Sequence, residues 1–354
     1  MEETKRPYTG MEGRHHRYQG RIVCSLPVAS KDGFGSTIHL GKASDRCSLR
    51  TESLSATAYV PGAVSVLNSY ATGKGVAFGI GLGQTVEVSL TPTSTCGDVT
   101  VLSSYRSDRG ASLVRECVRK TLALGDSDNC FDTRVTVSSN LPIARGLKSS
   151  SALANATVLA VANAIGADLS LGQMMSIARA AEIKAGVSTF GSIDDGWATA
   201  LGGVVCADSE SRRVLWRHSS QDALDAVILA PPESARHIAT GARESLRSFK
   251  KEMTGLCAMA SRGDVFQPMT VNAIVHARQF GYDAGVIFAA LAFGAKGVAL
   301  SGKGPAYVAL TARTETNKVI GAWRKYGHKI LVTGIDNRGA VIRNAAGDRM
   351  RKEA

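Results

Sequence analysis

The sequence predicts an α+β protein in two lobes, each built of antiparallel sheet covered by helices. Patterns typical of strands and of helices alternate in short runs along most of the chain. No internal repeat or low-complexity tract interrupts them. The 354 residues, of which 44% are hydrophobic, can bury a sizeable core, and this length suggests two domains or one domain with two lobes.

The first half of the chain predicts two strands, a helix, a further strand and a second helix. Strands are expected over residues 55–66 and 78–90, and a helix over 112–124. Residues 134–138 alternate apolar and polar side chains, which is typical of a half-buried strand. Residues 152–165 are apolar and uncharged, so they predict a long helix inside the core.

The second half of the chain continues the alternation. Its expected elements are a strand over 226–229, a helix near 234–249, an apolar helix over 284–293, strands over 296–300 and 306–311, a helix over 315–326 and a strand over 329–334.

Composition excludes several classes of partner. The formal net charge is +12, but the basic residues are spread along the chain without a run of five, and aromatic residues make up only 6%, so we expect no nucleic-acid partner. The longest uncharged apolar run, 152–167, is shorter than the roughly 20 residues that cross a bilayer, so no membrane partner is expected. No secretory signal is evident, and the seven cysteines form no Cys-x-x-Cys pair, so a cytoplasmic protein is expected.

The most informative segment places a glycine and three consecutive serines at the start of the expected apolar helix. Gly146 is followed closely by Ser149, Ser150 and Ser151. Backbone N–H groups at a helix N-terminus have no partner inside the helix, and the helix dipole adds about half a positive charge there, so this segment is suited to binding phosphate.

Other interpretations of the glycine segments were weighed. Serine is a good helix cap, so an ordinary capped helix is the simplest alternative. A Walker A loop requires Gly-x-x-x-x-Gly-Lys followed by Ser or Thr, whereas Gly73 and Lys74 are followed by Gly75. No Gly-x-Gly-x-x-Gly opens a helix with an acidic residue about twenty positions later, so a Rossmann site is also excluded. The expected nucleotide site therefore lies at residues 146–151.

Residues 142–152 resemble the phosphate loop of the GHMP small-molecule kinases, Pro-x-x-x-Gly-Leu-x-Ser-Ser-Ala. With the additional serine, Ser151, the loop reads Gly-Leu-Lys-Ser-Ser-Ser-Ala, which resembles the archaeal type of shikimate kinase within that family. Residues 68–80 and 191–196 agree with this narrower resemblance. Residues 301–306, Ser-Gly-Lys-Gly-Pro-Ala, resemble the C-terminal glycine loop of the family. Residues 61–68 lack the His-x-Asp or His-x-Glu pair of many members, which makes a sugar kinase less suitable.

The resemblance implies the GHMP kinase fold, with a ribosomal protein S5 domain 2-like N-terminal lobe and a ferredoxin-like α/β C-terminal lobe. The expected organisation is a flexible extension at 1–52, an ATP-binding N-terminal lobe at 53–205, a C-terminal lobe at 206–340 and a mobile tail at 341–354.

The resemblance also implies an ATP-dependent shikimate kinase that uses Mg²⁺ and transfers the γ-phosphoryl group to the 3-hydroxyl of shikimate. A homoserine or mevalonate kinase-like enzyme, or a non-catalytic ligand-binding protein on the same fold, is the alternative. The residues expected to bind the nucleotide are Pro142, Arg145, Gly146, Leu147, Lys148, Ser149, Ser150, Ser151 and Ala152.

Magnesium prefers oxygen ligands, so Ser150 or Ser151 with Glu182 is the expected metal-binding set. A solvated Glu182 paired with a nearby lysine is the alternative. Spacing from the following Gly-Gly pair favours Asp195 as the residue that orients the acceptor hydroxyl, whereas counting forward from Gly191 favours Asp194, so both remain candidates. Asp194 and Asp195 are expected in a short turn flanked by glycines, Gly191 and Gly196. Repulsion between the two neighbouring carboxylates is expected to raise the pKa of one of them.

Shikimate carries a carboxylate and three hydroxyls, so its pocket requires a basic side chain and small polar groups. The candidates for binding this acceptor are Asn68, Thr72, Lys74, Ser301, Gly302, Lys303 and Gly304.

Overall fold

The computed structural model describes residues 53–94, 97–104, 107–125, 130–188, 193–220, 223–233 and 242–343. The expected extension at 1–52 lies outside these residues, as do the first part of the helix expected near 234–249 and the expected tail beyond residue 343.

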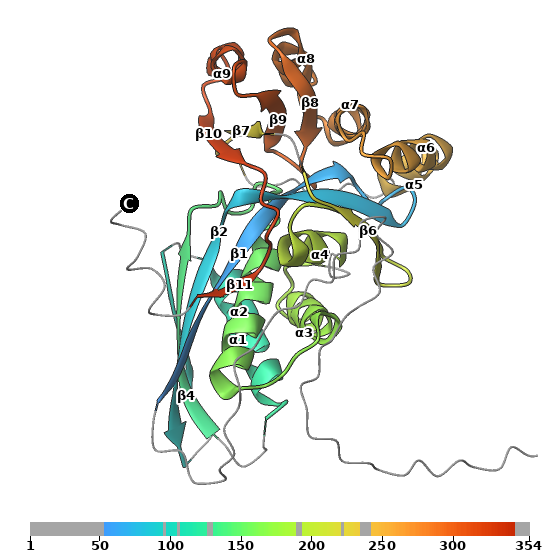
Figure 1. Ribbon diagram of the computed structural model, residues 1–354. Helices are drawn as coiled ribbons and strands as arrows, with labels where there is room; N and C mark the ends of the chain where they lie inside the picture. The colour runs from blue at the N-terminus through green and yellow to red at the C-terminus, as the bar shows by residue number, and fades with distance from the viewer. Residues whose placement is uncertain are drawn as a thin grey trace, which may run out of the picture.

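The N-terminal lobe is a seven-stranded sheet with helices packed on one face (Figure 1). Its long strand β2 pairs with β1 along its length, with β4 at its C-terminal half and with β5 at its start. The strands of this sheet are β1 (Leu54–Leu67), β2 (Lys74–Thr93), β3 (Val99–Ser103), β4 (Cys130–Ser139), β5 (Val204–Asp208), β6 (Arg213–His218) and β11 (Val341–Arg343). The helices are α1 (Asp108–Leu122), α2 (Ser149–Ile165), α3 (Leu171–Lys184) and α4 (Ile193–Leu201).

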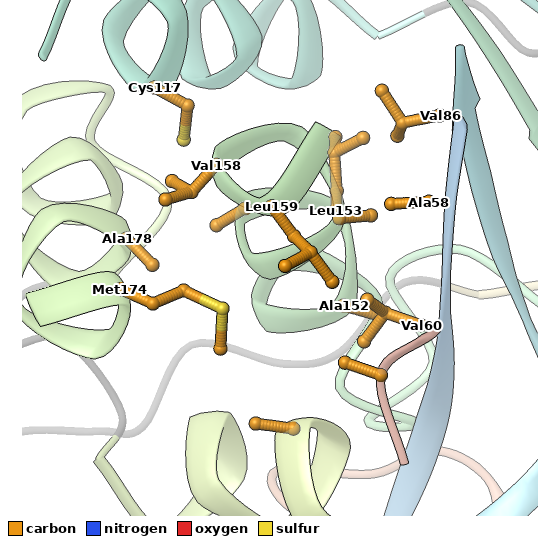
Figure 2. Close-up of a cluster of buried hydrophobic side chains, with 14 of the residues drawn as sticks. Ala58, Val60, Val86, Cys117, Ala152, Leu153, Val158, Leu159, Met174 and Ala178 are labelled. Carbon is orange, nitrogen blue, oxygen red and sulfur yellow. The ribbon is translucent and has the colours of Figure 1, made fainter. Parts of the chain in front are cut away.

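Helix α2 is the centre of this lobe because it is apolar on all sides and therefore must be enclosed. Leu153 and Leu159 on α2 pack toward the sheet and the surrounding helices (Figure 2). Val60 and Val86 come from the sheet, and Met174 comes from α3. This packing fixes the position of the α2 N-terminus, where the serines lie.

The C-terminal lobe is a four-stranded antiparallel sheet in the order β10-β7-β9-β8, again with helices against it. Along the chain it reads β-α-β-β-α-β, which is the ferredoxin-like arrangement. The strands are β7 (Leu224–Ala230), β8 (Ala295–Leu300), β9 (Tyr307–Ala312) and β10 (Lys329–Gly334). The helices are α5 (Ala242–Arg247), α6 (Lys250–Ala260), α7 (Phe266–Phe280), α8 (Gly285–Ala292) and α9 (Thr316–Arg324).

One hydrophobic cluster spans the two lobes. Phe78 and Leu147 of the N-terminal lobe are fully buried in the same cluster as Ile228, Met269 and Val308 of the C-terminal lobe. The α+β class expected from the sequence is confirmed. The C-terminal sheet is antiparallel as expected, whereas the N-terminal sheet is mixed, because β3 pairs with β4 in parallel. None of the helices in the described ranges is both long and apolar enough to cross a membrane.

The structure differs from the expected organisation in three places. The boundary between residues 205 and 206 falls inside β5, and β5 and β6 both pair within the N-terminal sheet, so the chain changes lobe after β6. Residues 341–343 of the expected tail form β11 beside β1. Asp194 and Asp195 lie in the first turn of helix α4, not in a separate turn.

Candidate active site

The phosphate loop expected from the sequence has an unusual backbone in the part that precedes α2, residues 141–148. Ala144, Gly146 and Lys148 have positive φ angles of 58°, 85° and 61°. A Cβ atom on Gly146 would lie 2.0 Å from the carbonyl oxygen of Ser301, so only glycine fits this position. The residue preceding α2 is Lys148, whose side chain makes no capping hydrogen bond. The capped-helix interpretation of the serines is therefore wrong.

The three serines at the start of α2 have different surroundings. The buried Ser149 hydroxyl accepts a hydrogen bond from the Ala144 N–H at 3.4 Å, which ties the loop to the helix. Ser150 is partly exposed. The buried Ser151 hydroxyl donates to Glu182 Oε1 at 2.8 Å. The Ser151–Glu182 pair thus lies just behind the positive end of α2.

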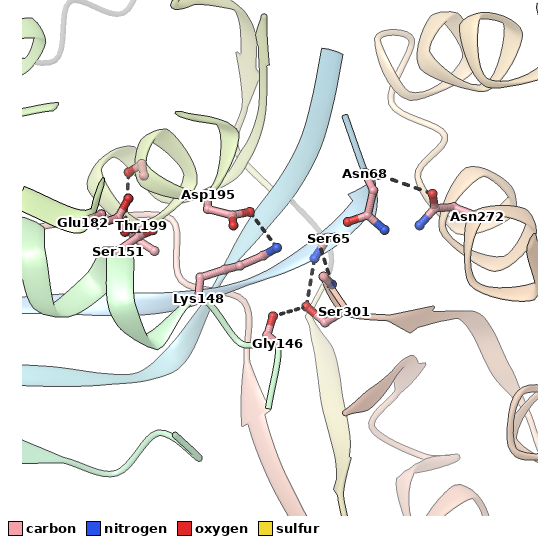
Figure 3. Close-up of polar contacts among 12 residues, drawn as sticks. Ser65, Asn68, Gly146, Lys148, Ser151, Glu182, Asp195, Thr199, Asn272 and Ser301 are labelled. Carbon is pink, nitrogen blue, oxygen red and sulfur yellow. Dashed lines mark hydrogen bonds and ion pairs between the residues drawn. The ribbon is translucent and has the colours of Figure 1, made fainter. Parts of the chain in front are cut away.

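Glu182 is not the solvated helix carboxylate of the alternative interpretation. It is 3% exposed and directed at Ser151 from α3 (Figure 3). A buried carboxylate beside a hydroxyl is an oxygen-donor set that suits Mg²⁺. Within the described residues no cluster of three or more His, Cys, Asp or Glu side chains could hold a metal ion, so phosphate and water oxygens would have to complete the coordination.

Lys148 and Asp195 form an ion pair beside the loop. Lys148 Nζ lies 2.6 Å from Asp195 Oδ1, and the two side chains are 5% and 17% exposed (Figure 3). Asn155 of α2 holds α4 in position, because its side-chain amide donates to Gly196 O at 3.0 Å and to Thr199 Oγ1 at 2.9 Å. Helix α4 therefore presents Asp195 next to the N-terminus of α2.

The neighbouring carboxylates occupy distinct environments. Asp194 is buried against β2, where a Cβ atom on Gly75 would lie 2.1 Å from Asp194 Oδ2. Burial raises the pKa of Asp194 to about 7, and the negative charge of Asp195 adds to this rise, while Lys148 opposes it. The raised pKa expected for one of the two acids thus falls on Asp194, while Asp195 has the cationic partner and the greater exposure.

The C-terminal glycine loop lies directly against the phosphate loop. The buried Ser301 hydroxyl donates to Gly146 O at 2.8 Å and accepts from the Ser65 N–H at 3.2 Å. In turn, the Gly302 N–H donates to Ser65 Oγ at 3.2 Å. Ser301, which the sequence placed among the acceptor-binding residues, thus uses its hydroxyl to join the two lobes.

The remaining acceptor candidates are divided between two regions. Asn68 is buried directly after the end of β1, and Figure 3 shows it on the other side of Ser65 from the ion pair. Thr72 uses its hydroxyl within the β1–β2 turn, donating to Lys74 O at 3.0 Å and accepting from the Lys74 N–H at 3.1 Å. The backbone of Lys303 accepts from the Tyr282 hydroxyl at 2.8 Å, and a Cβ on Gly304 would collide with the ring of that tyrosine.

Sequence reasoning missed two polar residues of this region, Asn272 and His276. Both are buried on α7, a helix that the sequence analysis did not identify. The only available signal was an Asn and a His four residues apart, which share one helix face.

A pocket of about 500 Å³ opens on the outer side of the phosphate loop. The Arg145 guanidinium, which lines it, donates to Pro232 O across the lobe boundary. The residues around this pocket are Ser139, Asn140, Leu141, Pro142, Ile143, Arg145, Ala230, Pro231, Pro232, Gly327, His328 and Lys329.

Solved structures with this fold include small-molecule kinases. Homoserine kinase from Cytophaga hutchinsonii superposes with a TM-score of 0.63 at 18% sequence identity, covering 85% of this chain and all of that chain. Mevalonate kinase from Methanococcus jannaschii gives a TM-score of 0.60 at 13% identity, covering 79% of this chain and 98% of that one. At these identities the likeness establishes the GHMP kinase fold alone.

Sequence comparison gives a narrower result. Residues 112–203 match the family model for the GHMP kinases N terminal domain. The shikimate kinase of Methanothrix thermoacetophila is 36% identical over 293 residues, covering 82% of this chain and 96% of the relative. That of Methanothermobacter thermautotrophicus is 35% identical over 287 residues, covering 80% and 96%. With the phosphate loop, the paired acids and the glycine loop on two packed lobes, this chain belongs to the GHMP kinases, in the family of the archaeal shikimate kinases.

Proposed function

We propose that this protein is a shikimate kinase that transfers the γ-phosphoryl group of ATP to the 3-hydroxyl of shikimate. The observation that carries the proposal is the Lys148–Asp195 ion pair of 2.6 Å beside the N-terminus of α2. A carboxylate that can orient a hydroxyl, a cation and an anion-binding helix end meet there, and phosphoryl transfer requires these groups. The acceptor is taken from the relatives, whose names give shikimate kinase.

The nucleotide phosphates would be held by residues 146–151. The backbone N–H groups of the first turn of α2 have no partner within the helix, and the positive end of the helix dipole favours phosphate oxygens. The nucleoside would occupy the pocket on the outer side of the loop, which includes Pro142 and Arg145. Lys148 would stabilise the negative charge that develops on the transferred group.

Ser150 or Ser151 together with Glu182 would hold Mg²⁺ near the phosphates, with their donor oxygens as ligands. When bound, the ion would supply charge neutralisation for the phosphate oxygens. Asp195 would accept a hydrogen bond from the 3-hydroxyl of shikimate and take its proton as the new O–P bond forms, while the bond from the γ-phosphorus to the β–γ bridging oxygen breaks and ADP leaves. Asp194, buried against β2, would have a structural part in holding α4 on the sheet.

The test is a coupled ADP-release assay on the purified protein with ATP and magnesium, offering shikimate, homoserine or mevalonate separately. Turnover with shikimate alone is expected. Turnover with another of these alcohols would retain the kinase chemistry and reject the acceptor, whereas no turnover with any of them would favour a ligand-binding protein on the same fold.

A further inference from the structure

Three buried polar side chains lie beside the proposed reaction site and have no role in the reaction as proposed above. Asn68 directly follows β1, and Asn272 and His276 occupy successive turns of α7, which packs on β1. Their exposed fractions are 6%, 0% and 2%. Asn68 Nδ2, Asn272 Nδ2 and His276 Nε2 find no hydrogen-bond partner among the described residues. A buried polar atom left unpaired costs about 1–3 kcal/mol, so three in one place indicate that a ligand completes them.

The other polar atoms of these side chains are held by hydrogen bonds that define what the free atoms can do. The Asn68 backbone N–H donates to Asn272 Oδ1 at 3.3 Å, so the Asn272 amide nitrogen is left as a donor. His276 Nδ1 lies 2.8 Å from the backbone carbonyl oxygen of Asn272. A carbonyl oxygen only accepts, so Nδ1 carries the hydrogen atom and Nε2 of the neutral ring is an acceptor.

The ring is neutral at physiological pH. Burial lowers the pKa of His276 to about 4; the hydrogen bond to Asn272 opposes this, and the Lys148 ammonium lowers the pKa further. Tyr70 and Phe280 pack around the imidazole with ring centroids 6.0 and 5.4 Å away, so its orientation is fixed.

The cluster and the reaction site are connected through the lobe junction. Lys148 Nζ would lie 3.2 Å from a Cβ on Gly302. The Gly302 N–H is hydrogen-bonded to the side chain of Ser65 on β1, three residues before Asn68. Figure 3 shows Asn68 between Ser65 and Asn272, with Lys148 and Asp195 on the opposite side of Ser65. A molecule whose reacting hydroxyl meets Asp195 could therefore extend its other polar groups toward α7.

We propose that Asn68, Asn272 and His276 form a subsite for a non-reacting hydroxyl of the acceptor. The hydroxyl would donate its hydrogen to His276 Nε2 and accept hydrogen bonds from the two amide nitrogens, which satisfies all three free atoms at once. A carboxylate does not fit, because it has no hydrogen atom to offer Nε2. This inference depends on the proposed function, and it assigns the subsite to the 4- or the 5-hydroxyl of shikimate, with the carboxylate of shikimate bound elsewhere.

The test combines a side-chain change with a change in the acceptor. His276→Phe retains an aromatic ring between Tyr70 and Phe280 and removes the acceptor nitrogen. The kcat/KM of wild type and variant would be measured with shikimate, 4-deoxyshikimate and 5-deoxyshikimate. With shikimate, the variant should lose about tenfold to a hundredfold. With the analogue that lacks the bound hydroxyl, wild type and variant should be nearly equal.

An equal loss with all three acceptors would overturn the subsite, because a purely structural role cannot distinguish hydroxyl groups. Wild-type protein that turns over none of them would instead overturn the proposed function, so the two failures are separable. Asn68→Ala is a second variant that tests the subsite if His276→Phe fails to fold. The side-chain amide nitrogen of Asn68 makes no hydrogen bond within the described chain, so its removal breaks no such bond. Asn68→Ala should show the same dependence on the acceptor hydroxyl, and both variants should bind ATP like wild type.

Discussion

Asp194 and Asp195 are adjacent in sequence, yet they have separate environments. The start of α4 directs one carboxylate at β2 and leaves the other beside Lys148. Of the two candidates that the spacing left open, this geometry favours Asp195 as the proposed base. The sequence could not decide between them because the direction of each side chain depends on how α4 packs on α2 and on the sheet.

Asp195→Asn should abolish most of the turnover while ATP binding is retained. The amide retains the shape of the carboxylate but cannot take the proton of the acceptor hydroxyl, so kcat should fall by about 10²–10⁴-fold. Steady-state kinetics and an ATP titration measure the two effects. Asp168→Asn, in an exposed loop, is the matched control and should behave as wild type. Full activity of Asp195→Asn would refute the assignment.

Asp194 should make the protein less stable as the pH rises. Its pKa is about 7 in the folded chain and near 3.8 in the unfolded chain, so the folded state holds a proton that the unfolded state has released. The free energy of unfolding should therefore decrease between about pH 4 and pH 7, by up to about 4 kcal/mol from this group.

Urea unfolding of wild type and Asp194→Asn across that range measures the contribution. The asparagine resembles the protonated acid and cannot ionise, so the variant should show the shallower pH dependence. If the free energy of unfolding changed equally with pH in the two proteins, the pKa of Asp194 would not be raised in the folded state, and this prediction would be wrong.

At the scale of elements, the conformation of the phosphate loop requires glycine at position 146. Gly146→Ala would combine an unfavourable φ with a contact of 2.0 Å to the Ser301 carbonyl oxygen, so the loop would have to move. We expect at least a tenfold loss of ATP affinity and a stability loss of about 1–3 kcal/mol.

The matched control is Gly166→Ala at the C-terminal end of α2. Gly166 also has a positive φ, of 70°, but no atom lies within 4 Å of the added Cβ. This variant should lose about 1 kcal/mol of stability and retain ATP affinity. Isothermal titration with ATP distinguishes the two, and equal affinities would contradict the part assigned to Gly146.

Strongly patterned elements could be predicted from the sequence, whereas those defined by tertiary packing could not. The strands β1 and β2 and the apolar helix α2 could be predicted because their sequences show alternating or continuous hydrophobic residues. Helix α7 mixes polar and apolar residues, and its Asn272 and His276 are buried only because α7 packs on β1. Gly196 suggested a turn, but it lies inside α4, where a Cβ would meet Met175 Cε at 2.2 Å. That glycine reflects close helix packing.

At the scale of the whole molecule, Ser301 connects the lobes through its hydroxyl. Ser301→Ala would leave the Gly146 carbonyl and the Ser65 N–H without this partner in a buried place, so the free energy of unfolding should fall by about 1–3 kcal/mol. Ser248→Ala is the control, because its hydroxyl bonds only locally at the surface, and it should change stability by less than about 0.5 kcal/mol. Chemical unfolding measures both, and equal small effects would show that the junction does not depend on Ser301.

The close approach of Gly146 to Ser301 also limits how this protein can be divided. Residues 112–203 match the family model, but part of what holds the phosphate loop in shape is Ser301, which lies 155 residues after Gly146 in the chain. The Ala306 N–H, which donates to Arg145 O at 3.1 Å, adds a second such contact. The segment proposed to bind the nucleotide therefore depends on the C-terminal lobe for its conformation. A recombinant or truncated protein that separates it from the C-terminal glycine loop would retain the motif and lose the loop conformation.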